Sequence, residues 1–312
     1  MKKLIAILLV LPVLFACRNE KKEEILVLHA GSLSIPFKDM AEAFMTKYPD
    51  INVALEAYGS RTCARQITDL KRRADVMASA DSEVIRNLLM PEYADFCIDF
   101  TTNEMVIMYG EKSRFAEKIN ARNWFDILLK PGVEYGHSNP NFDPCGYRAV
   151  LTMQLAEKHY RVPGLYDKLK ERMPQKNIRP KEVDLIALLE AGELDYIFIY
   201  RSVAEQHRAP YVILPDEINL KSAALRDFYR QASIKVTGKK PGDWIKKQGE
   251  PMVYGITLPN IAKNPPGGAK FIAFVLDEEG RQIMKKNGQP VIFPPIVANP
   301  GKLPEGLKKY FR

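Results

Sequence analysis

Two short Gly-Ser turns are the first positions in this sequence that could bind an anion. Gly31-Ser32 and Gly59-Ser60 each follow an apolar run and precede a segment with helical spacing. Glycine lets the backbone approach a ligand closely, serine adds a neutral hydroxyl donor, and the N–H groups of a first helical turn favour negative charge. Serines in such turns also act as helix N-caps without any ligand, so both interpretations stay open.

Two further helix starts carry acids. Asp143 followed by Pro144 is typical of an N-cap and a first helical residue, which predicts free N–H groups at Cys145 and Gly146. Asp143 could equally do no more than cap its own helix. Glu182 lies at the front of another predicted helix, where acids are common, so its position alone does not indicate a ligand. The sequence has no GxGxxG or GxxxxGK[ST] pattern, which disfavours nucleotides.

The elements that must position these residues alternate between strand and helix. The apolar spacing predicts strands at 25–28, 51–55, 75–78, 105–109, 196–200, 211–214, 233–237 and 253–258. It predicts helices at 37–48, 62–72, 124–129, 147–160 and 183–190, a loop at 136–143, and a last helix ending at Asn287-Gly288 before an extended tail. This alternation indicates an α/β fold with a parallel sheet. Ligands of such sheets bind at the carboxyl ends of strands, where both Gly-Ser turns fall.

Composition and charge narrow the class of protein. The 312 residues are 46% hydrophobic and 27% charged, which excludes a disordered or coiled-coil chain and favours two lobes. The formal net charge is +8, or 8 − 2 = +6 without Lys2 and Lys3. Because the basic residues are scattered among 38 acids, we expect mild attraction for anions and no binding to nucleic acid.

The N-terminus has the pattern of an export signal. Lys2-Lys3 precedes an apolar run, Leu4 to Phe15, that is too short to span a bilayer. The run ends in Leu14-Phe15-Ala16-Cys17, which resembles a bacterial lipobox. We therefore expect a lipoprotein signal peptide at 1–16, acylation of Cys17, and a polar tether at 17–24 that leaves the protein on the periplasmic side of a membrane. An ordinary secretory signal with an incidental cysteine is the alternative.

The other cysteines match no zinc or redox motif. Cys63, Cys97 and Cys145 are expected to be buried small hydrophobes, with a Cys63–Cys97 disulfide as an alternative. The four histidines show no metal-ligand spacing, so a zinc enzyme is disfavoured.

Several motifs taken together resemble the WtpA branch of the ModA-like ABC-transporter receptors, which bind tungstate and molybdate. The motifs are Ala-Gly-Ser-Leu at 30–33, Tyr-Gly-Ser-Arg at 58–61, Asn-Pro-Asn-x-Asp-Pro-Cys-Gly-Tyr-Arg at 139–148, Arg-Pro-Lys-Glu-x-Asp-Leu at 179–185, Leu-Asp-Tyr-Ile-Phe-Ile-Tyr-Arg at 194–201 and Val-Tyr-Gly-Ile-Thr at 253–257. The likeness runs from residue 25 to the C-terminus. It departs from the family near 172–178 and at 100–103, away from every expected ligand position.

This resemblance implies a two-lobed type II periplasmic-binding-protein fold with a ligand cleft between the lobes. Lobe 1 would comprise 25–103 plus 233–312, and lobe 2 would comprise 104–232. By the same resemblance, the oxyanion would be bound from lobe 1 by Gly31, Ser32 and Ser60, and from lobe 2 by Asp143, Pro144, Cys145, Glu182 and Tyr200. The receptor would be a monomer without a cofactor or enzymatic activity, and it would deliver its ligand to an ABC permease and its ATPase.

Two acids in a site for a dianion need a physical reason. A carboxylate about 4 Å from a doubly negative oxyanion is repelled by several kcal/mol at an effective dielectric of about 20. Asp143 and Glu182 are explained if their oxygens bond to the central molybdenum or tungsten, which can expand beyond four oxygens, whereas sulfur and phosphorus in such anions cannot. The alternatives are a sulfate or phosphate receptor, and a periplasmic serine hydrolase using Ser32 or Ser60. The hydrolase is disfavoured because the sequence has no GxSxG or SxxK motif.

Overall fold

The structure is a computed structural model that describes residues 22–240 and 242–311. The predicted signal peptide and Cys17 therefore lie outside the described residues. Among the described residues, no helix is long and apolar enough to cross a membrane.

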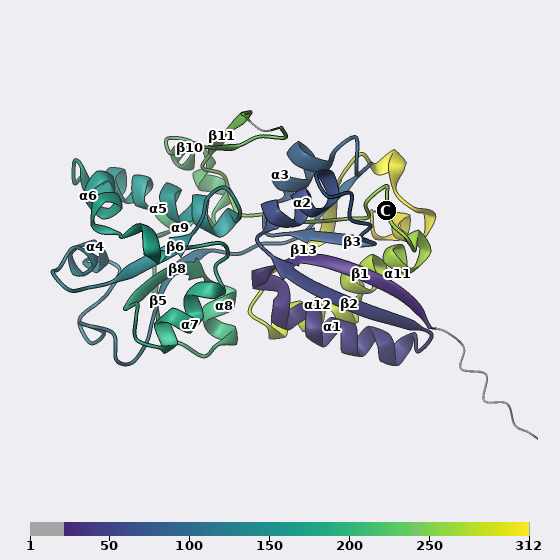
Figure 1. The fold of residues 1–312 in the computed structure, drawn as a ribbon, viewed down its shortest axis with the longest axis horizontal. Coiled ribbons are helices and arrows are strands. Elements are labelled where there is room, and N and C mark those ends of the chain that lie inside the picture. Colours follow the sequence, from purple (N-terminus) through teal and green to yellow (C-terminus); the bar gives the residue numbers. More distant parts are fainter. Residues whose placement is uncertain (1–21, 241, 312) are drawn as a thin grey trace, which may run out of the picture.

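Two separate sheets form the centres of two lobes (Figure 1). The first sheet has the strand order β13-β4-β12-β3-β1-β2, and the second has the order β7-β6-β8-β5-β9. The first contains β1 (Glu23–Ala30), β2 (Ile51–Tyr58), β3 (Val76–Ser79), β4 (Cys97–Thr101), β12 (Tyr254–Thr257) and β13 (Val291–Ala298). The second contains β5 (Met105–Tyr109), β6 (Tyr135–Ser138), β7 (Ile178–Arg179), β8 (Tyr196–Tyr200) and β9 (Tyr211–Ile213).

Both sheets are mixed, so the expectation of a parallel sheet is correct only in part. β1 is parallel to β2 and β3, and β6 is parallel to β7 and β8. β12 runs antiparallel to β3 and β4, and β5 runs antiparallel to β8 and β9. These antiparallel strands come from the segments where the chain passes between the lobes, and periodicity alone does not give strand direction.

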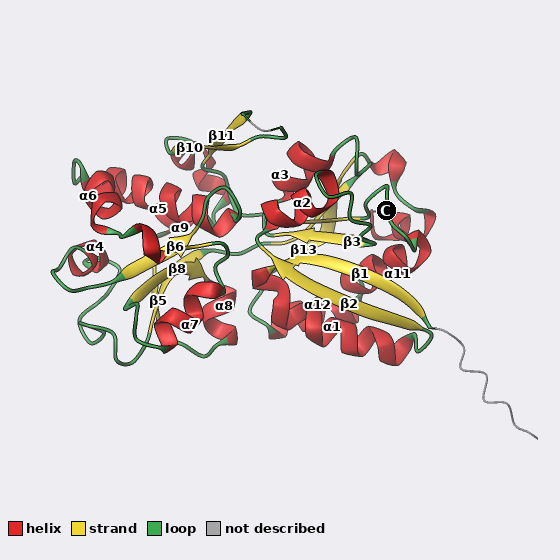
Figure 2. Ribbon diagram, in the orientation of Figure 1, coloured by secondary structure: helices red, strands yellow, loops and turns green. Residues whose placement is uncertain are grey.

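Helices cover both faces of each sheet (Figure 2). In the first lobe, α1, α11 and α12 pack on one face and α2 and α3 on the other; in the second, α5, α6 and α9 lie opposite α7 and α8 (Figure 1). The helices are α1 (Ser34–Lys47), α2 (Ser60–Thr68), α3 (Ser82–Val84), α4 (Trp124–Leu128), α5 (Pro144–Tyr160), α6 (Leu165–Arg172), α7 (Asp184–Glu190), α8 (Arg201–Gln206), α9 (Asp216–Asn219), α10 (Arg226–Tyr229), α11 (Pro265–Leu276) and α12 (Glu278–Lys286).

A small hairpin belongs to neither large sheet. β10 (Ser233–Thr237) pairs with β11 (Trp244–Gln248) in a sheet of two strands. Its backbone at Ser233 exchanges hydrogen bonds of 2.9 and 3.1 Å with Gln154 of α5, while Thr237 contacts Arg65 of α2. The hairpin therefore touches both lobes, and the division of the chain at 103/104 and 232/233 stays a prediction.

Two local expectations were wrong. The predicted loop at 136–143 contains β6 up to Ser138, because this short strand is inserted between β7 and β8. The single predicted last helix is two helices, α11 and α12. Asp277 breaks them apart: its backbone is extended, with ψ 177°, and its carboxylate accepts a hydrogen bond of 3.1 Å from Gly280 N–H as the N-cap of α12.

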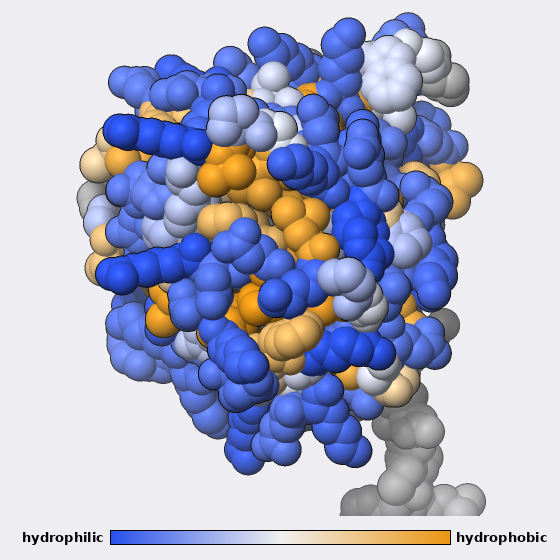
Figure 3. Space-filling model, turned by 90° about the vertical axis from the view of Figure 1, so that its left-hand side faces the viewer, coloured by the Kyte–Doolittle hydropathy of each residue, from blue (hydrophilic) through white to orange (hydrophobic). Residues whose placement is uncertain are grey.

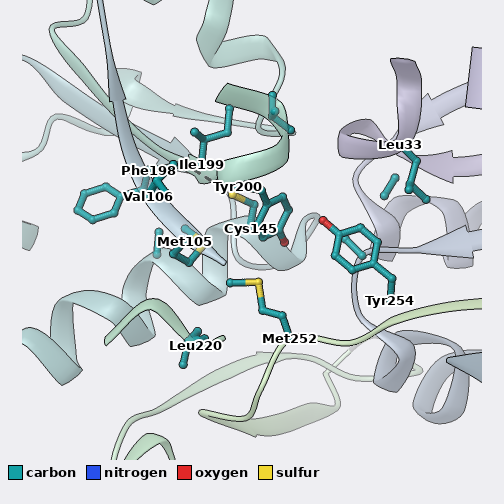
Figure 4. Packing of buried hydrophobic residues seen from close by; sticks show 14 of the residues in the cluster. Leu33, Met105, Val106, Cys145, Phe198, Ile199, Tyr200, Leu220, Met252 and Tyr254 are labelled. Atoms are coloured by element: carbon teal, nitrogen blue, oxygen red, sulfur yellow. Dashed lines mark hydrogen bonds between the residues drawn. The ribbon is translucent and has the colours of Figure 1, made fainter. Parts of the chain in front are cut away.

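Large buried side chains fill both lobes. Phe37, Phe44 and Phe271 pack edge-on in the first lobe, and Trp124 packs edge-on against Phe198 in the second. Figure 4 shows the apolar cluster continuing between the lobes, where Tyr200 and Tyr254 approach one another. The end of the second lobe that faces away from the first is largely hydrophilic, with apolar side chains near its middle (Figure 3).

Candidate functional site

The two Gly-Ser turns lie at the carboxyl ends of neighbouring parallel strands. Ser32 is in a 3-10 turn (Gly31–Leu33) directly after β1, and Ser60 is the first residue of α2 after β2. Both side chains are buried, and neither caps its own helix. Instead, Ser32 Oγ lies 3.1 Å from the Tyr254 hydroxyl, and Ser60 Oγ accepts a hydrogen bond of 2.9 Å from Ala80 N–H. The N-cap interpretation of these serines is therefore wrong.

The start of α2 binds the other lobe directly. The N–H groups of Arg61 and Thr62 donate to the Phe142 carbonyl oxygen at 3.1 and 3.3 Å. These first-turn donors, which the sequence suggested for an anion, bond a protein carbonyl in this structure. Their bonds hold the segment before α5 against the second Gly-Ser turn.

Asp143 is the N-cap of α5, as predicted. Its Oδ1 accepts a hydrogen bond of 3.1 Å from Cys145 N–H, and its backbone carbonyl accepts one of 3.1 Å from Gly146 N–H. The N–H groups expected to be free at Cys145 and Gly146 are thus bonded to Asp143. The second carboxylate oxygen, Oδ2, accepts a hydrogen bond of 2.8 Å from Glu182 N–H.

Glu182 has the most unusual environment of the candidate residues. It lies two residues before α7, its side chain is 1% exposed, and neither carboxylate oxygen has a hydrogen-bond partner. Burial, followed by the charge of Asp143, raises the pKa of the Glu182 carboxyl well above its ordinary value. An unpaired buried carboxylate is costly, so this group is poised either to hold a proton or to bond an electrophile.

Each acid of the second lobe faces one Gly-Ser turn of the first. A Cβ atom added at Gly31 would lie 3.1 Å from Glu182 Oε1, and one added at Gly59 would lie 3.1 Å from Asp143 Cβ and 2.4 Å from the Phe142 carbonyl oxygen. Glycine is therefore required at position 59, whereas a Cβ at position 31 would require the Glu182 carboxylate to shift by a few tenths of an ångström. The two turns and the two acids form one site between the lobes.

Tyr200 completes the site from the end of β8. Its ring contacts the ring of Tyr254 edge-on, with the centroids 6.0 Å apart, and Figure 4 shows the two hydroxyls pointing toward the same region. The Tyr200 hydroxyl accepts a hydrogen bond of 2.9 Å from Arg148 Nη1. Burial raises the pKa values of both phenols, so both keep their protons and can act as donors.

The structure adds residues that the sequence argument did not assign to the site. Arg148 also donates to the Ala80 carbonyl oxygen at 2.6 Å. Asp81 accepts hydrogen bonds from the Tyr147 hydroxyl and, at 2.7 Å, from Lys247 Nζ. Burial works to raise the pKa of Asp81, but Lys247 and Arg148 outweigh it and lower the pKa below its ordinary value. Tyr147, Arg148 and Tyr254 lie inside motifs already singled out, which was the available signal; Asp81 and Lys247 carried none.

Among the described residues, no group of three or more His, Cys, Asp or Glu side chains could hold a metal ion. Cys63, Cys97 and Cys145 are buried and free, so the alternative Cys63–Cys97 disulfide is not formed. What the site offers is hydroxyl donors from both lobes and two carboxylates.

Comparison with known proteins decides the family. The family described as bacterial extracellular solute-binding protein matches residues 25–289. The chain belongs to this family. Membership makes it a solute-binding protein of the kind that serves transport, and not an enzyme.

Relatives place this solute-binding protein within the WtpA branch, which confirms the resemblance. A solute-binding protein of Petrotoga mobilis is 57% identical, covering 93% of this chain and 90% of that protein. The protein named molybdate/tungstate-binding protein WtpA of Thermococcus kodakarensis is 41% identical, covering 93% of this chain and 88% of the relative. The WtpA protein of Pyrococcus abyssi is 39% identical, and the match covers 93% of this chain and 90% of that protein.

Solved structures confirm the fold. The periplasmic molybdate-binding protein of Azotobacter vinelandii has a TM-score of 0.62 at 16% identity, covering 85% of this chain and 98% of that one. The sulfate-binding protein SubI of Mycobacterium tuberculosis has a TM-score of 0.58 at 11% identity. The match covers 86% of this chain and 87% of that one. The fold is the two-lobed type II architecture of periplasmic solute-binding proteins.

Proposed function

We propose that this solute-binding protein captures molybdate or tungstate between its lobes and delivers it to an ABC permease and its ATPase. The observation that carries the proposal is the Glu182 carboxylate, which is buried without a hydrogen-bond partner beside the Gly31-Ser32 turn. The WtpA relatives, whose names give molybdate and tungstate as ligands, support it.

The unpartnered carboxylate fits a ligand whose central atom accepts further oxygens. Two ionised carboxylates facing sulfate, which has no proton to donate, would repel it. Molybdenum or tungsten can take up carboxylate oxygens in addition to its own four, which converts the repulsion into bonding. In this proposal Glu182 and Asp143 bond the central metal of the oxyanion, which is cargo and not a cofactor.

The remaining residues would bind the oxygens or hold the acids. Ser32, Ser60 and Tyr200 supply hydroxyl donors, and Gly31 lets the Glu182 carboxylate approach the first Gly-Ser turn. Pro144 has no N–H group, and the N–H of Cys145 already donates to Asp143. These two residues therefore hold Asp143 in place rather than donate to the oxyanion.

The N-terminal segment indicates where in the cell the protein would act. We propose that acylation of Cys17 anchors the protein to the periplasmic side of a membrane, with 17–24 as a tether to a monomeric two-lobed receptor. One acyl-modified cysteine next to a polar segment would keep the receptor near its permease.

Titration of the purified protein without its lipid tests the proposal. Molybdate and tungstate should bind and displace each other, while sulfate and phosphate should bind far more weakly. Binding should also raise the melting temperature, because a ligand at 100 times its Kd stabilises the folded state by about 2.7 kcal/mol. Equal or tighter binding of sulfate would overturn the molybdate/tungstate assignment.

A further inference from the structure

The direction of one hydrogen bond decides what Ser32 can offer a ligand. Ser32 Oγ and the Tyr254 hydroxyl lie 3.1 Å apart, and either oxygen could be the donor. If Ser32 donates to Tyr254, its oxygen presents a lone pair to the site. If Tyr254 donates to Ser32, the Ser32 proton is left for the ligand.

Asn103 settles this direction through its own fixed orientation. The backbone N–H groups of Glu104 and Ser202 donate to Asn103 Oδ1 at 3.0 and 3.4 Å. A backbone N–H can only donate, so the atom it meets must be the amide oxygen. Asn103 Nδ2 then donates to the Tyr254 hydroxyl at 3.0 Å and to Ser202 Oγ at 2.8 Å.

The fixed orientation of the Asn103 amide determines the direction of the hydrogen bond between Tyr254 and Ser32. The Tyr254 oxygen accepts from Asn103, and the hydroxyl is fully buried. Its own proton therefore needs an acceptor, and Ser32 Oγ is the one within reach. The opposite direction would leave a buried phenol proton without a partner, which proteins avoid.

We propose that Asn103 and Tyr254 are positioning residues that make Ser32 a hydrogen-bond donor toward the bound oxyanion. This inference rests on the proposed function and deepens it, because it specifies a ligand that presents only acceptor oxygens at Ser32. Asn103 lies in the segment joining β4 of the first lobe to β5 of the second, and Ser202 lies in α8 of the second lobe. The segment that connects the lobes thus determines whether Ser32 donates or accepts toward the ligand.

Ser60 and Tyr200 are also left as hydrogen-bond donors toward the ligand, and each is oriented by one direct hydrogen bond. Ser60 Oγ accepts from the N–H of Ala80, and the Tyr200 hydroxyl accepts from Arg148. The Ala80 N–H and the Arg148 guanidinium can only donate, so the proton of each hydroxyl is available to the ligand. A relay is needed only at Ser32, which makes Asn103 and Tyr254 specific targets.

A double-mutant cycle tests the relay in the full-length mature protein with molybdate as the probe. Tyr254→Phe removes the donor to Ser32 and should weaken binding about three- to tenfold. Asn103→Asp keeps the acceptor for Glu104 N–H but removes the donor to Tyr254. Tyr254 must then donate to residue 103, and Ser32 must turn its proton toward Tyr254, so binding should weaken about tenfold or more.

The relay predicts that these two effects are not additive. In the Tyr254→Phe background the reversal cannot reach Ser32, so Asn103→Asp should weaken molybdate binding only through its added charge, and by several-fold less than in the wild-type background. The same fold-loss in both backgrounds would overturn the proposal, because the added charge alone would then explain it. Tyr135→Phe, which removes a buried hydroxyl that donates to the Leu169 carbonyl oxygen, is the matched control and should leave affinity unchanged.

Neutron diffraction of the deuterium-exchanged wild-type protein gives a second test that needs no variant to fold. Deuterium bonded to the Tyr254 oxygen and directed at Ser32 Oγ supports the relay, whereas deuterium bonded to Ser32 and directed at Tyr254 overturns it. If the wild type bound none of the four oxyanions, the proposed function would fail, and the neutron map would still decide the direction of the relay.

Discussion

The carboxylate of Asp143 accepts a hydrogen bond of 2.8 Å from the backbone N–H of Glu182, which joins two helix starts separated by 39 residues. Asp143 is therefore part of the scaffold that presents Glu182, besides being a candidate ligand. The Glu182 carboxylate lies beside Asp143, but neither of its oxygens makes a hydrogen bond of normal geometry. Asp143→Ala would remove an N-cap worth about 1 kcal/mol and release the Glu182 segment, so Glu182 gives the cleaner test.

Closure of the lobes should depend on Gly59. Gly59→Ala would place a Cβ 2.4 Å from the Phe142 carbonyl oxygen, a backbone atom that cannot move aside without separating the lobes. We expect each lobe to fold, but the protein should stay open and bind molybdate at least tenfold more weakly, a loss of about 1.4 kcal/mol or more. Calorimetric titration and small-angle scattering with saturating ligand measure the two effects.

The matched control for Gly59→Ala is Gly301→Ala. A Cβ at Gly301 meets nothing within 4 Å, so this variant should bind and close like the wild type. A Gly59→Ala protein that contracts normally with molybdate would contradict the close approach between Gly59 and Phe142.

Lobe closure without ligand should weaken as pH rises. Burial raises the pKa of Glu182 in the closed arrangement, so the closed state binds this proton more tightly than an open one. By linkage, the closed fraction is greatest at low pH and falls as pH rises above the ordinary glutamate value of about 4.3. Small-angle scattering at pH 5 and pH 8 should show a larger radius of gyration at pH 8.

Glu182→Gln should abolish that pH dependence, because a neutral amide cannot lose a proton. His29 remains in this variant as an internal control. Its pKa is lowered to about 4, first by burial and then also by the charge of Lys181 from the other lobe, so it would favour closure at higher pH. A Glu182→Gln protein that still expands between pH 5 and pH 8 would show that another group controls closure.

Membrane attachment should depend on Cys17. Cys17→Ala removes the thiol that acylation requires, so the variant should move from the detergent phase to the aqueous phase on partition. Its affinity for molybdate should match that of the purified soluble protein, since the site begins at Gly31. Unchanged membrane retention of Cys17→Ala would refute the lipid anchor.

Local sequence signals predicted those parts of the fold that depend on local chemistry. β5, β8 and β10 have the predicted bounds, and Asp143 caps α5 as its Asp-Pro pattern indicates. β6 was missed because Gly136 suggests a loop, whereas the structure needs glycine there: a Cβ would lie 2.3 Å from the Asn177 carbonyl oxygen.

The parts of the site that could not be predicted are contacts between distant segments. Ser32 and Tyr254 are 222 residues apart, and Asp81 and Lys247 are 166 apart. No local pattern specifies such pairs. Ser32 and Tyr254 meet because β1 and β12 join the same sheet, and Lys247 reaches Asp81 from the small hairpin. The role of Glu182 was predicted only through the family resemblance, because an acid in the first turn of a helix is common. Its burial depends on the contact with Gly31 of the other lobe, which no local pattern specifies.

The most direct test of the central claim is calorimetric titration of Glu182→Gln with molybdate and with sulfate. Gln has nearly the same shape without the charge, and neither carboxylate oxygen of the wild type has a hydrogen bond of normal geometry to lose. Asp184→Asn, which removes a partly exposed acid beside Lys181 at the same helix start, controls for the general loss of charge. If Glu182 bonds the central metal, Glu182→Gln should weaken molybdate binding by about 1.5–3 kcal/mol, while sulfate binding stays equal or improves. A parallel loss for both anions, or no loss for molybdate, would contradict the claim that this carboxylate selects the oxyanion.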